Sequence, residues 1–144
     1  MVTQDYTCSI EAGVPAKEAY DKIARVPEWW AKNFEGSARK AGDRFTVRWG
    51  ETFVTFEISE AVPDSRVVWE VVDCYLPWLK DKTEWTGTRV AWEILSSGGK
   101  TTVTMIHHGL TPEVECYGSC EKGWNQYFQG SLLRFLTEGT GAPS

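Results

Sequence analysis

Positive charge and long apolar runs are both scarce in this sequence. The 144 residues carry 15 Lys and Arg against 20 Asp and Glu, which gives a net charge of −5 at pH 7. Proteins that bind nucleic acid neutralise phosphates with a basic surface, so we expect no nucleic-acid partner. No apolar run approaches the roughly 20 residues of a membrane-spanning helix, and Met1–Ile10 lacks the apolar core of a signal peptide. We therefore expect a cytoplasmic protein without membrane insertion.

The common sequence motifs of catalysis are also missing. The chain has no G-x-S-x-G nucleophile elbow, no H-E-x-x-H zinc motif and no glycine-rich phosphate loop. General acid–base catalysis needs two positioned groups whose pKa values are separated. Glu57 and Tyr127 are candidates to approach an interior site, but the sequence fixes the position of neither. The sequence thus gives no reason to assign a catalytic residue or a cofactor.

Cysteine is limited to four residues, Cys8, Cys74, Cys116 and Cys120. A domain of this length buries enough apolar surface to be stable without disulfides, so we expect reduced thiols. Cys116 and Cys120 would share one face of a helix, with His107 and His108 nearby in sequence. Their C-x-x-x-C spacing differs from that of zinc knuckles, and no second ligand pair follows. We interpret them as ordinary thiols and predict no metal site.

What the chain does contain is hydrophobicity with a period of two. Apolar residues alternate along the middle of the sequence, as in Phe45, Val47 and Trp49, which predicts half-buried strands. Ser96-Ser97-Gly98-Gly99 is a strong hairpin signal. About six strands are predicted, at 3–12, 43–49, 53–60, 67–71, 84–95 and 100–108.

Helical patterns flank these strands. Pro15 opens a first helix, and Pro27 either ends it or separates it from a short second turn over 28–33 that carries Trp29 and Trp30. Trp124, Phe128, Leu132 and Phe135 form an apolar stripe on a helix over about 119–138. We predict one α+β domain over 1–144, in which a curved antiparallel sheet wraps around this long C-terminal helix.

Several stretches of the chain are similar to a known family. Trp29-Trp30 followed by Gly42-Asp43-Arg44-Phe45, the segment 84–94, the segment 102–110 and Gly123-Trp124 followed by 131–133 occur in the family's order. Together they resemble the START-like, or SRPBCC, superfamily, in the branch named after activators of the 90-kDa heat-shock protein ATPase. The resemblance implies the helix-grip fold. It does not select an activity, because the superfamily includes lipid binders, cyclases, hydrolases and chaperone regulators.

Aromatic residues are the main candidates for a site. The alternation along the strands and the periodicity of the last helix predict that rings from both point into one interior. The candidate ligand-binding residues are Trp29, Trp30, Phe45, Trp49, Phe53, Trp69, Trp92, Met105, His107, Trp124, Phe128 and Leu132. An empty apolar void of about 300 Å³ would cost about 7 kcal/mol. The rings therefore either surround a ligand or water, or fill the space themselves.

His107 faces the predicted interior, whereas His108 should point to solvent. His107 orients a polar ligand group, or acts as an acid or base, or is a buried histidine that is hydrogen-bonded to a neighbour. Three functions remain open in this order. The first is binding of a small hydrophobic or amphipathic molecule, lipid-like or aromatic. The second is regulation of a chaperone ATPase through a protein contact. The segment 73–83 is either that contact, through Tyr75, Leu76, Trp78 and Leu79, or a loop folded over the mouth of the cavity. The third is a cyclase or hydrolase in the same cavity.

Overall fold

The computed structural model describes residues 6–77, 79–80, 82–110 and 117–143. Its centre is a seven-stranded antiparallel sheet with the order β1-β7-β6-β5-β4-β3-β2. The strands are β1 (Tyr6–Ala12), β2 (Asn33–Gly36), β3 (Arg44–Trp49), β4 (Thr52–Val62), β5 (Arg66–Tyr75), β6 (Arg89–Ser97) and β7 (Lys100–His108). Strands β2 to β7 lie in chain order, and each pairs antiparallel with the next.

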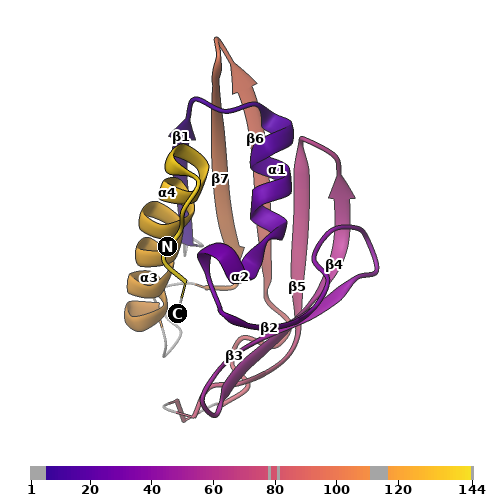
Figure 1. Cartoon of the computed structure of the whole chain (residues 1–144). Coiled ribbons are helices and arrows are strands. Elements are labelled where there is room, and N and C mark those ends of the chain that lie inside the picture. The colour runs from indigo at the N-terminus through magenta and orange to yellow at the C-terminus, as the bar shows by residue number, and fades with distance from the viewer. Residues whose placement is uncertain (1–5, 78, 81, 111–116, 144) are drawn as a thin grey trace, which may run out of the picture.

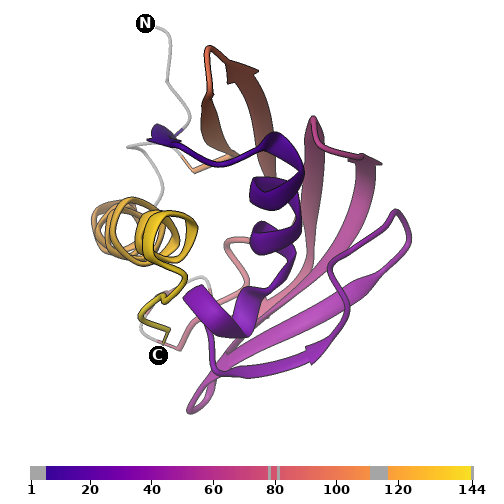
Figure 2. The same cartoon turned by 45° about the horizontal axis from the view of Figure 1, so that its top comes forward.

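The helices all lie on one side of this sheet (Figure 1). They are α1 (Ala16–Ala24), α2 (Val26–Trp29), α3 (Tyr117–Trp124), the π-helical segment η1 (Asn125–Leu132) and α4 (Leu133–Glu138). Figure 2 looks almost along the C-terminal helix and shows the sheet curving around it, with α1 and α2 inside the curve. The predicted helix-grip architecture is confirmed: α+β, a curved antiparallel sheet and a C-terminal helix.

Strand β2 is the one that sequence periodicity did not predict. Its four residues, Asn33–Gly36, pair with β3 but carry no buried side chain, so they show no apolar alternation. Gly36 ends the strand at a φ of 105°, and a Cβ at this position would lie 2.2 Å from the carbonyl oxygen of Arg44. Only glycine fits there. The sheet therefore has one edge strand more than expected.

The boundary between β5 and β6 also differs from the prediction. β5 continues to Tyr75, and β6 begins at Arg89 rather than near Glu84. The residues before β6 form turns that end at Gly87, whose φ is 93°. Trp85 consequently belongs to this loop and is buried with 8% of its surface exposed.

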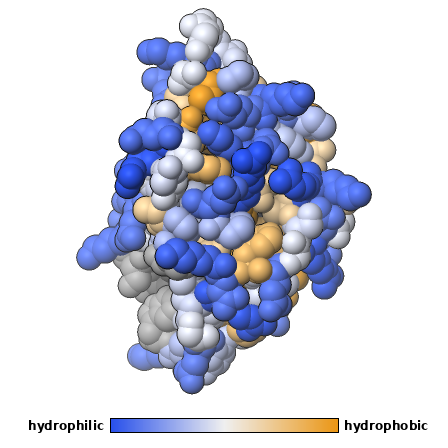
Figure 3. All heavy atoms as spheres, viewed as in Figure 1, coloured by the Kyte–Doolittle hydropathy of each residue, from blue (hydrophilic) through white to orange (hydrophobic). Residues whose placement is uncertain are grey.

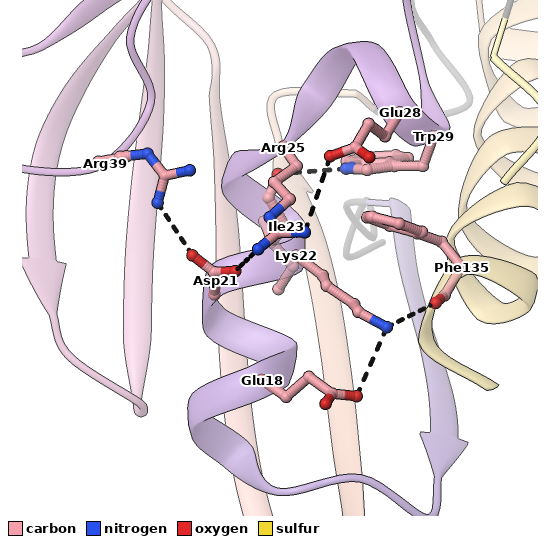
Figure 4. A network of polar contacts seen from close by, with 9 residues as sticks. All are labelled: Glu18, Asp21, Lys22, Ile23, Arg25, Glu28, Trp29, Arg39 and Phe135. Carbon is pink, nitrogen blue, oxygen red and sulfur yellow. Dashed lines mark hydrogen bonds and ion pairs between the residues drawn. The ribbon is translucent and has the colours of Figure 1, made fainter. Parts of the chain in front are cut away.

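Pro15 begins the first helix as predicted, whereas Pro27 lies inside the second helix rather than before it, because α1 already ends at Ala24. Pro15 is the N-cap of α1, and Pro27 lies in the first turn of α2, where the absent N–H costs no hydrogen bond. Helix α1 is tied to the C-terminal helix by Lys22, whose Nζ donates to the carbonyl of Phe135 at 2.9 Å and pairs with Glu18 at 3.5 Å (Figure 4). These contacts fix α1 against α4.

The C-terminal helix runs from Tyr117 to Glu138 and is interrupted by a π segment in its middle. The π-helix has hydrogen bonds between residues i and i+5, and such segments often occur at functional sites. The predicted apolar stripe is confirmed, since Trp124, Phe128, Leu132 and Phe135 are all buried. Gly139 ends the helix in the left-handed conformation, with a φ of 79°.

Candidate functional site

A continuous aromatic cluster fills the space between the sheet and the helices. Trp30, directly after α2, lies at its centre with an exposed fraction of 4%. The rings around it are Trp124 at 4.9 Å between centroids, Trp49 at 5.4 Å, Phe56 at 5.8 Å, Trp29 at 6.0 Å and Trp69 at 6.2 Å. Aromatic pairs at such separations contribute about 0.5–1.5 kcal/mol each beyond burial. Rings from α2, from the C-terminal helix and from the sheet therefore meet in one cluster.

Most of the predicted site residues lie in or beside this cluster. The buried members are Trp29, Trp30, Phe45, Trp69, Trp92, Met105, His107, Trp124, Phe128 and Leu132, and Trp49 is partly buried against them. They come from α2, β3, β5, β6, β7 and the C-terminal helix. The structure thus brings together residues that are far apart in the sequence, from Trp29 to Leu132.

Phe53 is the exception, and its predicted inward direction is wrong. It is the register partner of Arg48, and partners in an antiparallel pair share one face of the sheet. The Arg48 guanidinium lies over the Phe53 ring at 5.2 Å. Neighbouring Val54 and Phe56 point inward instead. The chain reversal before β4 sets this parity, and alternation inside one strand cannot reveal it.

Phe56 and Trp85 also belong to the aromatic cluster, although neither was among the predicted site residues. Phe56 stacks on Phe45 at 5.0 Å and contacts Trp69 at 5.4 Å. The alternation of Val54, Phe56 and Ile58 would have identified it. Trp85 contacts His107 at 4.6 Å and lies parallel to Trp124 at 6.1 Å. Because Trp85 lies in a loop, no periodic signal marks it.

Three indole N–H groups in the cluster are buried without a hydrogen-bond partner among the described residues. They belong to Trp49, Trp69 and Trp92, on three different strands. More than about nine in ten buried polar groups in proteins are paired, and an unpaired one costs about 1–3 kcal/mol. The interior therefore contains hydrogen-bond donors that lack an acceptor.

His107 has a partner at each ring nitrogen. The Trp124 indole N–H donates to its Nδ1 at 3.1 Å, and its Nε2 lies 2.9 Å from the hydroxyl oxygen of Thr88. Thr88 donates its hydroxyl proton to the carbonyl of Trp85 at 2.6 Å, so Nε2–H is the donor toward Thr88. The pattern defines a neutral histidine protonated on Nε2. It supports the interpretation of His107 as a buried, bonded histidine.

Ser131 of η1 ties three parts of the chain together. Its hydroxyl donates to the carbonyl of Trp29 and accepts a bond from the Ala142 backbone N–H at 2.7 Å. Gly141 lies so close to α2 that a Cβ there would be 2.5 Å from the Glu28 carbonyl oxygen. The segment after α4 is thereby held against α2.

Replacing Ser131 with alanine is expected to lower the free energy of unfolding by about 1–3 kcal/mol, because a buried carbonyl and a backbone N–H lose their partner. Urea denaturation measures the change. Thr137→Ala is the matched control, since its exposed hydroxyl bonds to the Leu133 carbonyl one turn back. This variant should change the free energy of unfolding by less than about 0.5 kcal/mol. Equal losses in the two variants would contradict the role of Ser131.

Polar contacts also join the C-terminal helix to β1. The Tyr6 hydroxyl donates to Oδ1 of Asn125 at 2.6 Å, and the Gln129 amide donates to Sγ of Cys8 at 2.7 Å. Burial raises the pKa of Tyr6 well above its ordinary value, so its phenol remains a donor at neutral pH. The π segment is therefore fixed to the edge strand.

A surface hollow of about 380 Å³ lies beside α1 and α2, and one of its lining residues, Phe34, stacks on Phe45 of the aromatic cluster at 5.5 Å. Arg25 and Arg39 on its rim both bind Asp21, at 2.8 Å and 2.9 Å (Figure 4). The hydrogen bond from Arg39 lowers the pKa of Asp21. The arginines of the hollow thus already have a counterion.

Hydrophilic residues cover most of the face seen in Figure 3, with apolar residues in small separate patches.

The remaining candidates of the sequence analysis lie elsewhere. Glu57 pairs with Arg44 at 2.8 Å as its cross-strand neighbour, and Tyr127 packs partly buried against the core. In the segment 73–83, Leu76 and Leu79 are buried, so they are not exposed contacts, while Trp78 lies outside the described residues. Cys116 also lies outside them, and the Cys116–Cys120 interpretation remains a prediction.

A sheet that grips a C-terminal helix over an aromatic interior defines a helix-grip protein of the START-like superfamily. The comparison with family models specifies the branch. Residues 18–136 match the family described as "Activator of Hsp90 ATPase homolog 1-like protein", and the chain belongs to that family. In the described part of the chain, no helix is both long and apolar enough to cross a membrane.

Solved structures with the same fold come from distant organisms. The solution structure of the Aha1 dimer from Colwellia psychrerythraea is 19% identical, with a TM-score of 0.78 over 98% of this chain and 100% of that chain. A crystal structure from Mesorhizobium loti is 17% identical, with a TM-score of 0.71 over 95% and 100%. Major latex-like protein 151 from Panax ginseng is 15% identical, with a TM-score of 0.63 over 90% and 95%. These likenesses show the fold alone. A comparison with curated protein sequences finds no significant match.

Proposed function

We propose that the protein binds a small hydrophobic or amphipathic molecule, lipid-like or aromatic, between the curved sheet and the C-terminal helix. The observation that carries this proposal is the set of three buried indole N–H groups without an acceptor, on Trp49, Trp69 and Trp92. Three such groups cost about 3–9 kcal/mol in total, against a typical domain stability of about 5–15 kcal/mol. A guest that accepts these bonds recovers much of that cost.

The proposed ligand contacts are the inward-facing residues of the aromatic cluster. They are Trp29, Trp30, Phe45, Trp49, Trp69, Trp92, Met105, His107, Trp124, Phe128 and Leu132. Phe53 is excluded, because it lies on the outer face of the sheet under Arg48. In this site His107 holds Trp124 in place rather than acting as an acid or base, since both of its nitrogens are bonded.

Nuclear magnetic resonance tests this proposal directly, because each tryptophan side chain gives a separate indole N–H signal. Apolar and aromatic compounds are added singly to the full chain. We expect a binding compound to move the signals of Trp49, Trp69 and Trp92, and native mass spectrometry should then give a one-to-one complex. The matched variant Phe53→Ala should bind with unchanged affinity. The proposal fails if the folded protein binds none of these compounds at the three indoles.

Regulation of a chaperone ATPase is a second candidate, and the family match over residues 18–136 favours it. This role would use the outer surface of the domain and would not require the interior. Adding the protein to the 90-kDa heat-shock protein should then raise its rate of ATP hydrolysis, and the two should co-precipitate. An unchanged rate together with no co-precipitation would exclude this candidate. This test does not depend on ligand binding. A variant of the interior, such as Trp69→Phe, should leave the effect on ATP hydrolysis unchanged even where it alters ligand binding.

A further inference from the structure

We propose, on the basis of the function above, that the ligand is a flat, uncharged ring compound bearing carbonyl-type acceptors. It occupies the place that the Trp30 indole now fills. Trp30 is the central ring of the cluster and contacts five neighbouring rings. In the protein without ligand, the Trp30 indole therefore fills the position that we propose for the ligand.

The walls of this position select for a flat molecule. The Trp30 indole lies nearly parallel to Trp29 on one contact, at 19° and 6.0 Å, and to Trp69 on another, at 10° and 6.2 Å. Stacked rings of this kind favour a planar partner over a branched or kinked one. Both rings also have contacts that do not involve Trp30: Trp29 contacts Trp92, and Trp69 contacts Phe45, Phe56 and Trp92. These contacts support the two rings when the Trp30 side chain moves. The vacated space has the shape of a fused bicyclic ring.

The donors around this space select for hydrogen-bond acceptors. Trp49 lies 5.4 Å from Trp30, and Trp92 lies 5.7 Å from Trp29 and 5.0 Å from Trp69. The unpartnered groups of Trp49, Trp69 and Trp92 are all N–H donors. The Trp30 indole adds another N–H donor and no acceptor to this space, so the other three indole N–H groups stay without a partner there. A carbonyl oxygen would accept one or two of these bonds.

The interior offers nothing to balance a charge. Among the described residues, the buried polar side chains are Thr101, His107 and Ser131. His107 is bonded at both nitrogens, Ser131 bonds to Trp29 and Ala142, and Thr101 bonds to the Val14 carbonyl. A carboxylate or ammonium group placed here would lose its hydration without gaining a counterion, which is strongly unfavourable. The ligand is therefore neutral.

The Trp30 and Trp29 side chains differ in their hydrogen bonds. The Trp29 indole donates to the carbonyl of Ile23 at 3.2 Å (Figure 4), and its own carbonyl accepts the bond from Ser131. Within the described residues, the Trp30 indole makes ring contacts and no hydrogen bond. It follows the four-residue helix α2 directly, so rotation of its side chain leaves the backbone anchor at Trp29 in place. Binding in this way requires the Trp30 side chain to rotate out of the cluster, and no hydrogen bond of its indole within the described residues opposes that rotation.

Three bicyclic probes of nearly equal size test the inference by calorimetric titration of the full chain. Coumarin has a lactone carbonyl, naphthalene has no acceptor, and 2-naphthoate carries a charge. We expect coumarin to bind about tenfold more tightly than naphthalene, as one or two satisfied donors imply. We expect 2-naphthoate to bind more weakly than both. Trp30→Ala, which empties the position, should bind coumarin at least about tenfold more tightly than the parent chain.

Two variants isolate the donors from the shape of the site. Trp69→Phe keeps a ring but removes one N–H, so the preference for coumarin over naphthalene should fall to about threefold or less. Phe53→Leu, on the outer face, should leave the preference unchanged. Trp30→Leu replaces Trp30→Ala if the smaller side chain prevents folding, and circular dichroism checks the fold of each variant.

The possible failures are distinguishable. Equal binding of naphthalene and coumarin, tightest binding of 2-naphthoate, or equal coumarin affinity of the parent and the Trp30 variants would each overturn this inference. All three outcomes leave the proposed ligand-binding function intact. Absence of binding by every probe, in folded parent and folded Trp30 variants alike, would overturn this inference. Failure of the wider compound set at the three indoles is what removes the proposed function.

Discussion

Replacing Trp69 with alanine is expected to lower the free energy of unfolding by about 3–5 kcal/mol. Trp69 is fully buried in the centre of β5, where its ring contacts Trp30, Phe45, Phe56 and Trp92 at 4.9–6.2 Å. Truncation removes these contacts and leaves a cavity in the aromatic cluster. Urea denaturation followed by circular dichroism measures the loss. It should shift the midpoint without changing the slope of the transition, because the same surface is exposed on unfolding.

The control for this change is Phe53→Ala, which removes an aromatic ring from the other face of the same sheet. Phe53 is partly exposed, and its described ring contact is with Arg48. A cation–π contact at an exposed site contributes about 0.5–1 kcal/mol, so the loss should be under about 1.5 kcal/mol. If Phe53→Ala cost as much as Trp69→Ala, the assignment of the two faces would be wrong.

Replacing His107 with leucine is expected to cost about 2–4 kcal/mol, although leucine is a good residue for an apolar core. The loss arises because the Trp124 N–H, now 3.1 Å from His107 Nδ1, would become a fourth buried indole without a partner. Thr88 would also lose the bond at 2.9 Å. Thermal and urea denaturation measure the change. The Trp124 indole signal should move in the nuclear magnetic resonance spectrum.

Thr88 provides the matched pair for this prediction. Thr88→Val removes the hydroxyl that accepts from His107 and donates to the Trp85 carbonyl, so it should cost about 1–3 kcal/mol. Thr88→Ser keeps the hydroxyl and removes only a methyl group, and about 1 kcal/mol is expected. If the serine variant lost as much stability as the valine variant, the hydrogen-bonded chain through His107 would contribute nothing measurable.

Much of the fold follows from periodicity in the sequence. Alternation at Phe45, Val47 and Trp49 identifies β3, and the stripe from Trp124 to Phe135 identifies the C-terminal helix. Strand β2 escaped prediction, because its four residues bury no side chain and are ordered by pairing with β3. Periodicity detects only elements that have a buried face.

The candidate site is less accessible to sequence reasoning. Parity correctly places Trp49, Trp69 and Trp92 in the interior, but the direction of Phe53 depends on the turn that precedes it. Hydrogen-bond partners are set by contacts between distant segments, as with Ser131 and Trp29, which are 102 residues apart. Which indoles lack an acceptor is therefore a property of the tertiary structure. No local pattern encodes it.

The π segment in the C-terminal helix leaves no trace in the spacing of the buried residues. Trp124, Phe128, Leu132 and Phe135 are four, four and three residues apart, which is the spacing of an ordinary α-helix, and all four are buried. A comparison of sequences by helical periodicity therefore treats this stretch as one unbroken α-helix. Only the backbone hydrogen bonds distinguish 125–132 from the turns on either side.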